Sequence, residues 1–456
     1  MIKLVNDTIE KEDIDQLIEW LKTYPKLTKG DNTLKLEKIF ADWIGTKYSV
    51  FVNSGSSANL LMLYALKYLK GDNLKVAVPS LCWATDLSPV MQLDMSPILV
   101  DCNLNDLSVD LNHLKEIFNS SNKPDVLLLV AVLGLSPNMK LIKELCDEYN
   151  VILLEDVCES QGTMFEGQKL GSFGLMGSFS TYFGHTMSTI EGGFITTNDK
   201  DLYDILIQLR SHGWDRDLDN NKQNELRKEW NTPDFNTLFT FYIPGFNLRS
   251  TDLQAFLGLK QMEKVDKMIS QRNSNYLLFI ELLKNHTWIP TPPKDSYTAS
   301  FCIPIIFKTK SNKENAIKEF RENQIEIRPL IAGSMGKQPF YVKKYVVKNT
   351  KHPQVALSGP PSPVKEYNYI YTGLNTDVLD FDIEFNAAYY VAVTLDKNQV
   401  RMNLLDENHV EELVDYFKYP AEARKNLTQQ FFQPKFEQKT IQSTNSSNEN
   451  YISLER

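Results

Sequence analysis

Residues 180–199, STYFGHTMSTIEGGFITTND, place His185 in a polar turn between two strand-like runs. The chain has no lysine between Lys169 and Lys200. Because an imidazole titrates near neutral pH, His185 has the chemistry of a general acid or base. A single turn histidine is more often an ordinary turn residue, so its role depends on what the fold places beside it.

Two carboxylates follow an apolar run in LLEDVCESQG, residues 153–162, with Asp156 at the end of the run and Glu159 three residues later. A buried carboxylate needs a cationic or hydrogen-bonding partner. The protonated nitrogen of a pyridine ring is one such partner. On this segment alone, an acidic loop after a strand is an equally good interpretation.

A Ser/Gly turn that contains Gly55 and Ser56 separates a buried strand from a helix in NSGSSANLL, residues 53–61. The free backbone N–H groups and the dipole of a helix start suit a phosphate group. An ordinary N-cap with a tight turn explains the same residues. Ser180, a polar residue in a strand-like run, is a further candidate.

Aromatic and charged residues mark three more candidate positions. Trp83 follows a strand and a turn in PSLCWATDLSPV, where its ring either stacks on a flat ligand or fills the core. Asn247 and Arg249 precede a helix in YIPGFNLRSTDLQAFLG, and Glu326 and Arg328 alternate outward on a short strand in IEIRPL. A helix start with a surface arginine and a solvated strand face are the plain alternatives for these two pairs.

Strand-like and helix-like segments alternate from residue 48 to residue 158 and must position these side chains. This alternation predicts an α/β fold with a mostly parallel sheet and helices on both faces. Ligands bind such sheets at the carboxyl ends of strands, where the polar residues above fall. Helical periodicity also covers 10–23, 32–44 and 249–283, the last as one long helix or two joined helices.

The patterns divide the chain into three regions. We predict a large domain with a linking helix (1–285), a small C-terminal α+β domain (286–420) and a polar tail (421–456). The tail is rich in Gln, Asn and Ser and lacks periodic apolar positions, which predicts disorder.

The composition is that of a soluble globular protein, with 42% hydrophobic and 23% charged residues. The formal net charge of −9 and the lack of a basic stripe argue against a nucleic acid partner. The longest apolar run, VLLLVAVLGL, is too short to span a bilayer. Five widely spaced cysteines lack metal-type spacing and suit a reducing compartment, so we expect a cytoplasmic protein without a metal.

The order and spacing of these motifs resemble the DegT/DnrJ/EryC1/StrS family of sugar aminotransferases, which use pyridoxal phosphate (PLP). The resemblance covers residues 25–340 and implies the aspartate aminotransferase type I fold of PLP-dependent transferases. His185 occupies the position of the lysine that holds the cofactor in this family. YFGHTMSTIEGG and IEIRPLIAGSMGKQP are similar to a branch with histidine there, the GDP-4-keto-6-deoxymannose 3-dehydratases of colitose biosynthesis.

The resemblance implies a role for each candidate residue near the cofactor. Gly55 and Ser56 bind the cofactor phosphate at the helix start, and Ser180 binds it as well. Asp156 pairs with the ring nitrogen and keeps it protonated. Glu159 supports the ring hydroxyl region or the amine of the substrate.

The resemblance also implies roles for the more distant candidates. Trp83 stacks on the pyridine ring. Asn247 and Arg249 reach the phosphate from the partner subunit, which implies a homodimer. Glu326 and Arg328 are placed toward the sugar nucleotide or glutamate.

Histidine cannot make the covalent bond to the cofactor aldehyde that lysine makes. The resemblance therefore implies that the cofactor is held without a covalent bond, as pyridoxamine phosphate (PMP). His185 is left with proton transfer while the 3-hydroxyl leaves a nucleotide-linked 4-keto-6-deoxy sugar. Glutamate then restores the amine form of the cofactor.

Other functions are compatible with the same residues. In the first alternative, the enzyme is a 3-dehydratase that acts on another nucleotide sugar. In the second, the chain is a catalytically silent relative that binds cofactor or sugar nucleotide. In the third, it is an aminotransferase in which Lys169 replaces the missing lysine. A second histidine branch holds an iron–sulfur cluster through cysteines, and the scattered cysteines disfavour it. The segment 387–400, AAYYVAVTLDKNQV, lacks the Gly-Asn-His pattern of the dehydratase branch, which leaves the exact substrate open.

Overall fold

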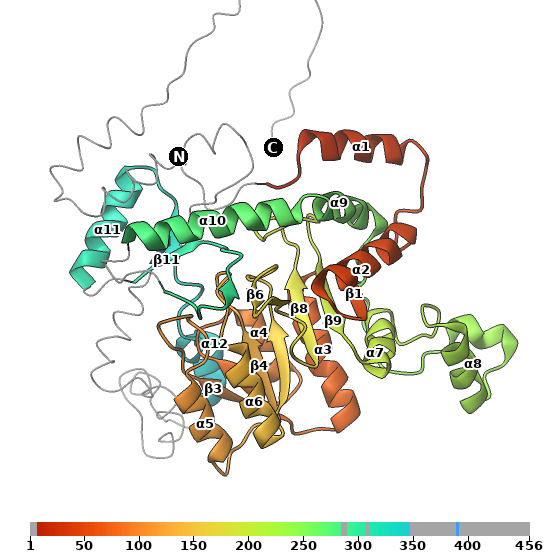
Figure 1. Cartoon of the computed structure of the whole chain (residues 1–456). Coiled ribbons are helices and arrows are strands. Elements are labelled where there is room, and N and C mark those ends of the chain that lie inside the picture. Colours follow the sequence, from red (N-terminus) through yellow and green to blue (C-terminus); the bar gives the residue numbers. More distant parts are fainter. Residues whose placement is uncertain (1–6, 284–289, 307–309, 347–388, 392–456) are drawn as a thin grey trace, which may run out of the picture.

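The computed structural model describes residues 7–283, 290–306, 310–346 and 389–391. Its centre is a seven-stranded sheet with helices on both sides (Figure 1). The strands lie in the order β1 (Tyr48–Val52), β9 (Gly193–Thr197), β8 (Met176–Ser180), β5 (Ile152–Asp156), β4 (Val126–Val130), β2 (Lys75–Pro79) and β3 (Ser96–Val100). Pairing is parallel from β8 to β3, and β9 is antiparallel to both of its neighbours. The predicted α/β fold with a mostly parallel sheet is confirmed.

The central strands are continuous apolar runs because helices cover both faces of the sheet. Alternate side chains enter two separate cores, so that Val76 and Val78 belong to one and Ala77 to the other. The first core packs against α3 (Gly55–Lys70), α4 (Ala84–Gln92) and α7 (Lys200–Arg210). The second core packs against α2 (Asp31–Ile44), α5 (Leu111–Asn119) and α6 (Met139–Tyr149).

The amphipathic stretch 249–283 forms two helices, α9 (Asp252–Met262) and α10 (Val265–Leu283). Thr251 caps the first of them, because its side chain accepts a hydrogen bond from Gln254 N. Figure 1 shows α10 running across one end of the sheet toward α11 (Lys310–Glu322). The helices predicted over 10–23 and 32–44 are confirmed as α1 (Lys11–Leu21) and α2.

Beyond residue 290 the described elements are short. β11 (Ile303–Ile305), β13 (Tyr389–Val391) and β12 (Ile327–Pro329) form an antiparallel sheet in that order. A second small sheet contains β10 (Ser296–Tyr297), β6 (Met164–Phe165) and β7 (Gln168–Lys169). The remaining elements are α8 (Asn220–Glu229), η1 (Asp234–Phe239), η2 (Met335–Lys337), α12 (Pro339–Tyr341) and η3 (Val342–Val346).

Some predictions fall where the structure gives no description. The domain boundary at 285/286 and the tail 421–456 lie outside the described residues, as does most of the segment 387–400. The division into two domains therefore stays a prediction. In the part of the chain that is described, no helix has the length and apolar character needed to cross a membrane.

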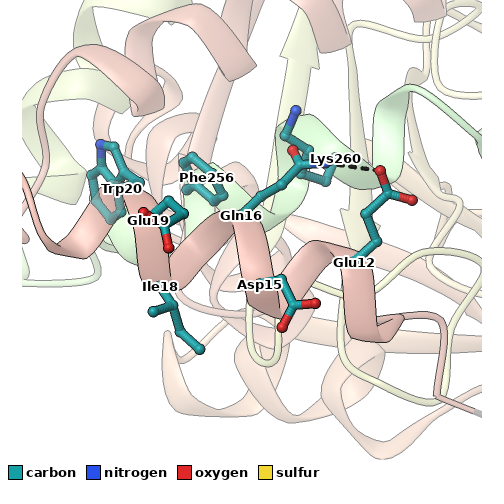
Figure 2. A pocket seen from close by; sticks show the side chains of 8 residues that line it. All are labelled: Glu12, Asp15, Gln16, Ile18, Glu19, Trp20, Phe256 and Lys260. Atoms are coloured by element: carbon teal, nitrogen blue, oxygen red, sulfur yellow. Dashed lines mark hydrogen bonds between the residues drawn. The ribbon is translucent and has the colours of Figure 1, made fainter.

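A groove lies between α1 and α9, where Trp20 stacks on Phe256 with ring centroids 5.0 Å apart (Figure 2). Figure 2 shows the acidic side chains of α1 along this groove and Lys260 reaching it from α9. None of the candidate residues predicted from the sequence lines the groove.

A buried ion pair joins α7, α2 and β1. The Arg210 side chain is fully buried, and its Nη1 atom lies 2.5 Å from Glu37 Oε1 and donates to Phe51 O at 2.9 Å. The same Glu37 oxygen accepts a hydrogen bond from Phe51 N at 2.8 Å. Removing one member leaves the other charge buried and uncompensated, which costs far more than losing an exposed pair.

We expect Arg210→Met to lower the free energy of unfolding by about 3–5 kcal/mol, because Glu37 then remains charged in the core. Urea denaturation followed by circular dichroism measures this change. Lys11→Met removes the exposed pair with Asp15 and serves as a control that should change stability little. Equal midpoints for the two variants would contradict a structural role for the buried pair.

Candidate active site at the carboxyl ends of β5 and β8

Asp156 ends β5 in the middle of the sheet and is 5% exposed. One carboxylate oxygen accepts a hydrogen bond from Cys158 N at 2.8 Å, and the other accepts one from the side-chain amide of Asn59 in α3. Among the described residues, no lysine, arginine or histidine forms an ion pair with it. A buried anion without a cation is costly, so Asp156 is suited to receive a positive charge from a ligand.

The predicted phosphate-binding residues meet at the start of α3. Ser54 caps this helix, which begins at Gly55. A Cβ atom added to Gly55 would lie 2.7 Å from both Cys158 Sγ and Ser180 Cβ, so only glycine allows this close approach. Ser180 ends β8 and is 6% exposed. Gly55, Ser56 and Ser180 therefore lie at one helix N-terminus, next to the loop that follows Asp156.

His185 lies in the connection between β8 and β9. Its ring centroid is 5.4 Å from that of Phe301 and 6.3 Å from that of Tyr182. Arg272 anchors the Phe301 loop by donating from Nη1 to Ser300 O at 2.9 Å. The Nδ1 atom of His185 is buried, and no described residue makes a hydrogen bond to it.

Burial lowers the pKa of His185 to about 4, although the Cys158 backbone and the Asp156 carboxylate both raise it. The positive charges of Arg328 and Arg272 lower the pKa further. The imidazole keeps some solvent contact, yet protein atoms surround it closely enough for burial to dominate. His185 is therefore neutral near pH 7 and is ready to accept a proton.

We expect the His185 ring of the ligand-free protein to titrate near pH 4. Unfolded histidine titrates at about pH 6.5, so the unfolded chain binds a proton that the folded chain does not between these values. Folding stability attributable to His185 therefore falls as the pH drops from about 6.5 toward 4. NMR of histidine-labelled protein measures the titration, and His185→Asn identifies the resonance. Titration of that resonance at an ordinary histidine pKa would contradict the prediction.

Glu159, Arg328 and Trp83 border the same space. Glu159 Oε2 accepts a hydrogen bond from Leu133 N at 3.0 Å. Burial raises the pKa of Glu159 to about 7, while the Leu133 backbone and Arg328 lower it. The guanidinium carbon of Arg328 lies 5.9 Å from the centroid of the Trp83 ring. Trp83 directly precedes α4 and is 49% exposed, so its ring is available for stacking on a flat ligand.

The other three predicted residues lie on two further segments, before α9 and before β12. The exposed Asn247 accepts a hydrogen bond from Arg249 Nε at 3.0 Å. Arg249 also lies over the Trp214 ring and bridges Val52 at the end of β1. Glu326 is exposed just before β12. Arg249 thus pairs with a residue two positions before the Ser54 cap of α3, and Glu326 lies two residues from Arg328. The contacts of these three residues with cofactor or substrate stay predictions.

Four residues of the site were not predicted from the sequence: Asn59, Asp86, Arg272 and Phe301. Asn59 carried a signal, because it is an isolated amide within the apolar run of α3 and is 1% exposed. Asp86 lies three residues after Trp83 and is equally buried. Arg272 and Phe301 come from distant segments, which only the packing of α10 and β11 brings near His185.

The lysines that flank His185 in the sequence are used elsewhere. Lys169 Nζ donates to Trp43 O at 2.8 Å and lies 4.8 Å from the centroid of that ring. Lys200 pairs with Asp204 and Asp219. These contacts argue against the alternative in which Lys169 replaces the missing lysine.

The donor set fits a phosphorylated pyridine. Asp156 offers a buried carboxylate to a ring nitrogen, and the glycine-containing helix start offers N–H groups to a phosphate. Trp83 offers a ring face, and the buried Nδ1 of His185 lacks a hydrogen bond. The five cysteines are free thiols, and the described residues contain no group of three His, Cys, Asp or Glu placed to hold a metal.

Comparisons with known proteins point to one family. Residues 7–357 match the DegT/DnrJ/EryC1/StrS aminotransferase family. A GDP-4-keto-6-deoxy-D-mannose 3-dehydratase from Yersinia pseudotuberculosis is 34% identical over 322 residues, which cover 69% of this chain and 81% of that relative.

Solved structures agree. An E. coli GDP-4-keto-6-deoxy-D-mannose-3-dehydratase with bound hydrated PLP superposes with a TM-score of 0.72 and 28% identity, over 92% of this chain and 98% of that one. A GDP-4-keto-6-deoxymannose-3-dehydratase with a trapped PLP-glutamate geminal diamine gives a TM-score of 0.72 and 26% identity, over 91% and 99%. The predicted fold of PLP-dependent transferases is confirmed.

Proposed function

Because the chain belongs to the DegT/DnrJ/EryC1/StrS aminotransferase family, we propose that it removes the 3-hydroxyl group from a GDP-linked 4-keto-6-deoxy sugar with PLP and PMP as cofactor. The observation that carries this proposal is a neutral histidine, with no lysine, beside a buried carboxylate at the cofactor position. An aminotransferase needs an amine there to release its product, whereas a dehydratase needs only an acid–base group.

The cofactor is held without a covalent bond by residues from four elements. The N–H groups of Gly55 and Ser56, together with the Ser180 hydroxyl, bind its phosphate. Asp156 pairs with the ring nitrogen and keeps it protonated. The exposed ring of Trp83 covers one face of the pyridine.

When bound, the cofactor supplies an amine for the keto group of the sugar and a ring that accepts electrons. His185 contributes the proton transfers. Its neutral imidazole accepts a proton at a ring nitrogen, and the resulting imidazolium delivers a proton to the departing 3-oxygen. Burial lowers the pKa of His185, so the imidazolium is a strong acid and returns its proton readily.

Arg328 and Glu159 are the charged groups best placed to meet substrate. Arg328 lies over the Trp83 ring and is close enough to Glu159 to lower its pKa, and its guanidinium suits a phosphate of the sugar nucleotide or a carboxylate of glutamate. Glu159, whose pKa burial raises to about 7, suits the ring hydroxyl region or an amine. Glu326, which is exposed and lies two residues before Arg328, is a further proposed substrate contact.

A spectroscopic experiment tests the reaction. PLP is added to purified protein, followed by glutamate, and conversion of the aldehyde to the amine form with release of 2-oxoglutarate is expected. GDP-4-keto-6-deoxymannose is then added, and release of ammonia together with a 3-deoxy sugar is expected. If ammonia were released from a dTDP-linked keto sugar and not from the GDP-linked sugar, the proposed substrate would be wrong and the dTDP-linked sugar would take its place. An unchanged spectrum after glutamate would remove the enzyme function and favour a binding protein.

The active form is proposed to be a homodimer. Asn247 is exposed and Arg249 is partly exposed in the single chain, which leaves both side chains accessible to the site of a second copy. Large apolar side chains are exposed on the neighbouring α8–η1 segment, which lies at the periphery of the molecule in Figure 1; they are Trp230, Phe235, Leu238, Phe239 and Phe241. Exposed apolar patches of this kind mark protein interfaces.

Subunit complementation tests the shared site. We expect His185→Asn and Asn247→Ala each to be poorly active, and their coexpression to restore activity. One site of the mixed dimer combines a native His185 with a native residue 247 from its partner. Each variant expressed alone provides the control. Failure to regain activity in a demonstrated heterodimer would place Asn247 outside the partner's site.

The compartment stays a proposal as well. We propose the cytoplasm, where the five free thiols are kept reduced.

A further inference from the structure

We propose that Asn59 and Asp86 are positioning residues, which fix the Asp156 carboxylate and the Trp83 backbone relative to each other. The inference rests on the proposed cofactor site, in which Asp156 pairs with the ring nitrogen and Trp83 covers one face of the pyridine. Neither Asn59 nor Asp86 is itself placed on the cofactor.

Asn59 lies in α3 with 1% exposure, and all its polar side-chain atoms are engaged. Its Nδ2 atom donates to Asp86 Oδ1 at 2.9 Å and to Asp156 Oδ2. Its Oδ1 atom accepts from the Ser178 hydroxyl at 2.6 Å. Because the hydroxyl of β8 holds the amide oxygen, both amide hydrogens must face the two carboxyl groups.

Asp86 connects the Asn59 amide to the backbone of Trp83. Its Oδ2 atom accepts a hydrogen bond from Trp83 N at 2.9 Å, which caps α4 and fixes the backbone that carries the indole. Asp86 is 1% exposed. Burial raises its pKa well above the ordinary aspartate value, and the neighbouring Asp156 raises it further. Burial therefore favours the neutral form of Asp86.

The arrangement leaves Asp156 ready for one additional donor. Cys158 N holds one of its oxygens and the Asn59 amide holds the other, so the plane of the carboxylate is set. A carboxylate has about four lone-pair positions, so these two donors leave room for a protonated ring nitrogen beside Asp86, which also lies within hydrogen-bond reach of Asp156. Without Asn59, one oxygen of Asp156 loses its amide donor, and Asp86, which already lies within hydrogen-bond reach of Asp156, is left as its neighbour there.

The test compares two ligands that differ only at the atom facing Asp156. PMP and its analogue with carbon in place of the ring nitrogen are bound to the apoprotein, and both dissociation constants are measured by calorimetry. The wild-type protein should prefer PMP. In Asn59→Leu this preference should shrink by roughly 10-fold, the equivalent of one hydrogen bond to a charged group. The affinity for the carbon analogue should change little.

Two further variants keep the result interpretable. Asn59→Ser is shorter and cannot bridge the two carboxyl groups, so it repeats the test if the leucine variant does not fold. Leu61→Ala is a matched control that removes buried packing from the same helix and should leave the ratio of the two affinities unchanged. Asp86→Ala should weaken both ligands, because it also releases the Trp83 backbone.

An unchanged ratio in the two folded Asn59 variants would overturn the positioning role, as would an equal loss for both ligands. Failure of the proposed function has a different signature. In that case the wild-type protein itself would bind neither ligand, or would bind both equally well.

Discussion

We expect His185→Asn to lower turnover by about 10²–10⁴-fold while cofactor affinity stays close to that of the wild-type protein. Asparagine keeps the size and polarity of the side chain but cannot carry a proton at neutral pH. The helix start at Gly55, the Asp156 carboxylate and the Trp83 ring do not depend on the imidazole, since no described hydrogen bond joins its Nδ1 atom to them. Single-turnover measurement of ammonia release, together with PMP binding by calorimetry, separates the two effects.

The pH profile sharpens this test. His185 of the wild-type protein should still act as a base at pH values well below the ordinary histidine pKa, so the rate should persist there. The reason is that burial lowers the pKa of His185 to about 4 in the ligand-free site. Tyr182→Phe, which keeps the ring beside His185, is a matched control and should retain turnover. If His185→Asn turned over substrate at the wild-type rate, His185 would not be the proton-transfer group and would be an ordinary turn histidine.

The second large effect is expected for Asp156→Asn, which should weaken PMP binding by roughly 30-fold to several thousand-fold. This range corresponds to the 2–5 kcal/mol lost when one partner of a buried charge pair is truncated. The neutral amide also ceases to keep the ring nitrogen protonated, so turnover should fall beyond the loss in affinity. Calorimetry measures PMP binding. Turnover measured at a saturating PMP concentration then shows the loss in rate separately from the loss in affinity.

Asp106→Asn provides a control matched for burial. Asp106 is 7% exposed and accepts hydrogen bonds from Asn103 and from Ser108 N in the loop after β3, with no contact to Asp156. The Asp106→Asn variant should bind PMP as tightly as the wild-type protein does. If Asp156→Asn also bound PMP normally, the ring nitrogen would have another partner and the cofactor orientation proposed here would be wrong.

The sheet and its helices were predictable because local pattern and burial agree. The run VLLLV of β4 is apolar at every position since both faces of the strand are covered, and helical periodicity located α2 nearly to the residue. Asp156, Ser180 and Gly55 could be placed near one another because strands end on a common edge of a parallel sheet. The length of α9 and α10 was left open, since the break at 263–264 carries neither proline nor glycine.

The remainder of the site was not readable from local pattern. Asn59 and Asp86 gain their importance only from each other and from Asp156, which lies 97 residues from Asn59 in the chain. Phe301 lies beside His185 in a loop that Arg272 of α10 holds through Ser300 O. Asn247, Arg249 and Glu326 were singled out from their segments, but their roles came from the family resemblance and stay predictions.

The pairing of β1 with β9 has a consequence for synthesis of the chain on the ribosome. Tyr48 is translated early, yet its partner Thr197 follows roughly 150 residues later. At a synthesis rate of about 5–20 residues per second, about 7–30 s pass between translation of β1 and translation of its partner strand β9. During that interval the apolar sequence YSVFV is exposed on a nascent chain that cannot yet close its sheet. The early chain is therefore a natural client for chaperones, and fragments that end before β9 should aggregate rather than fold.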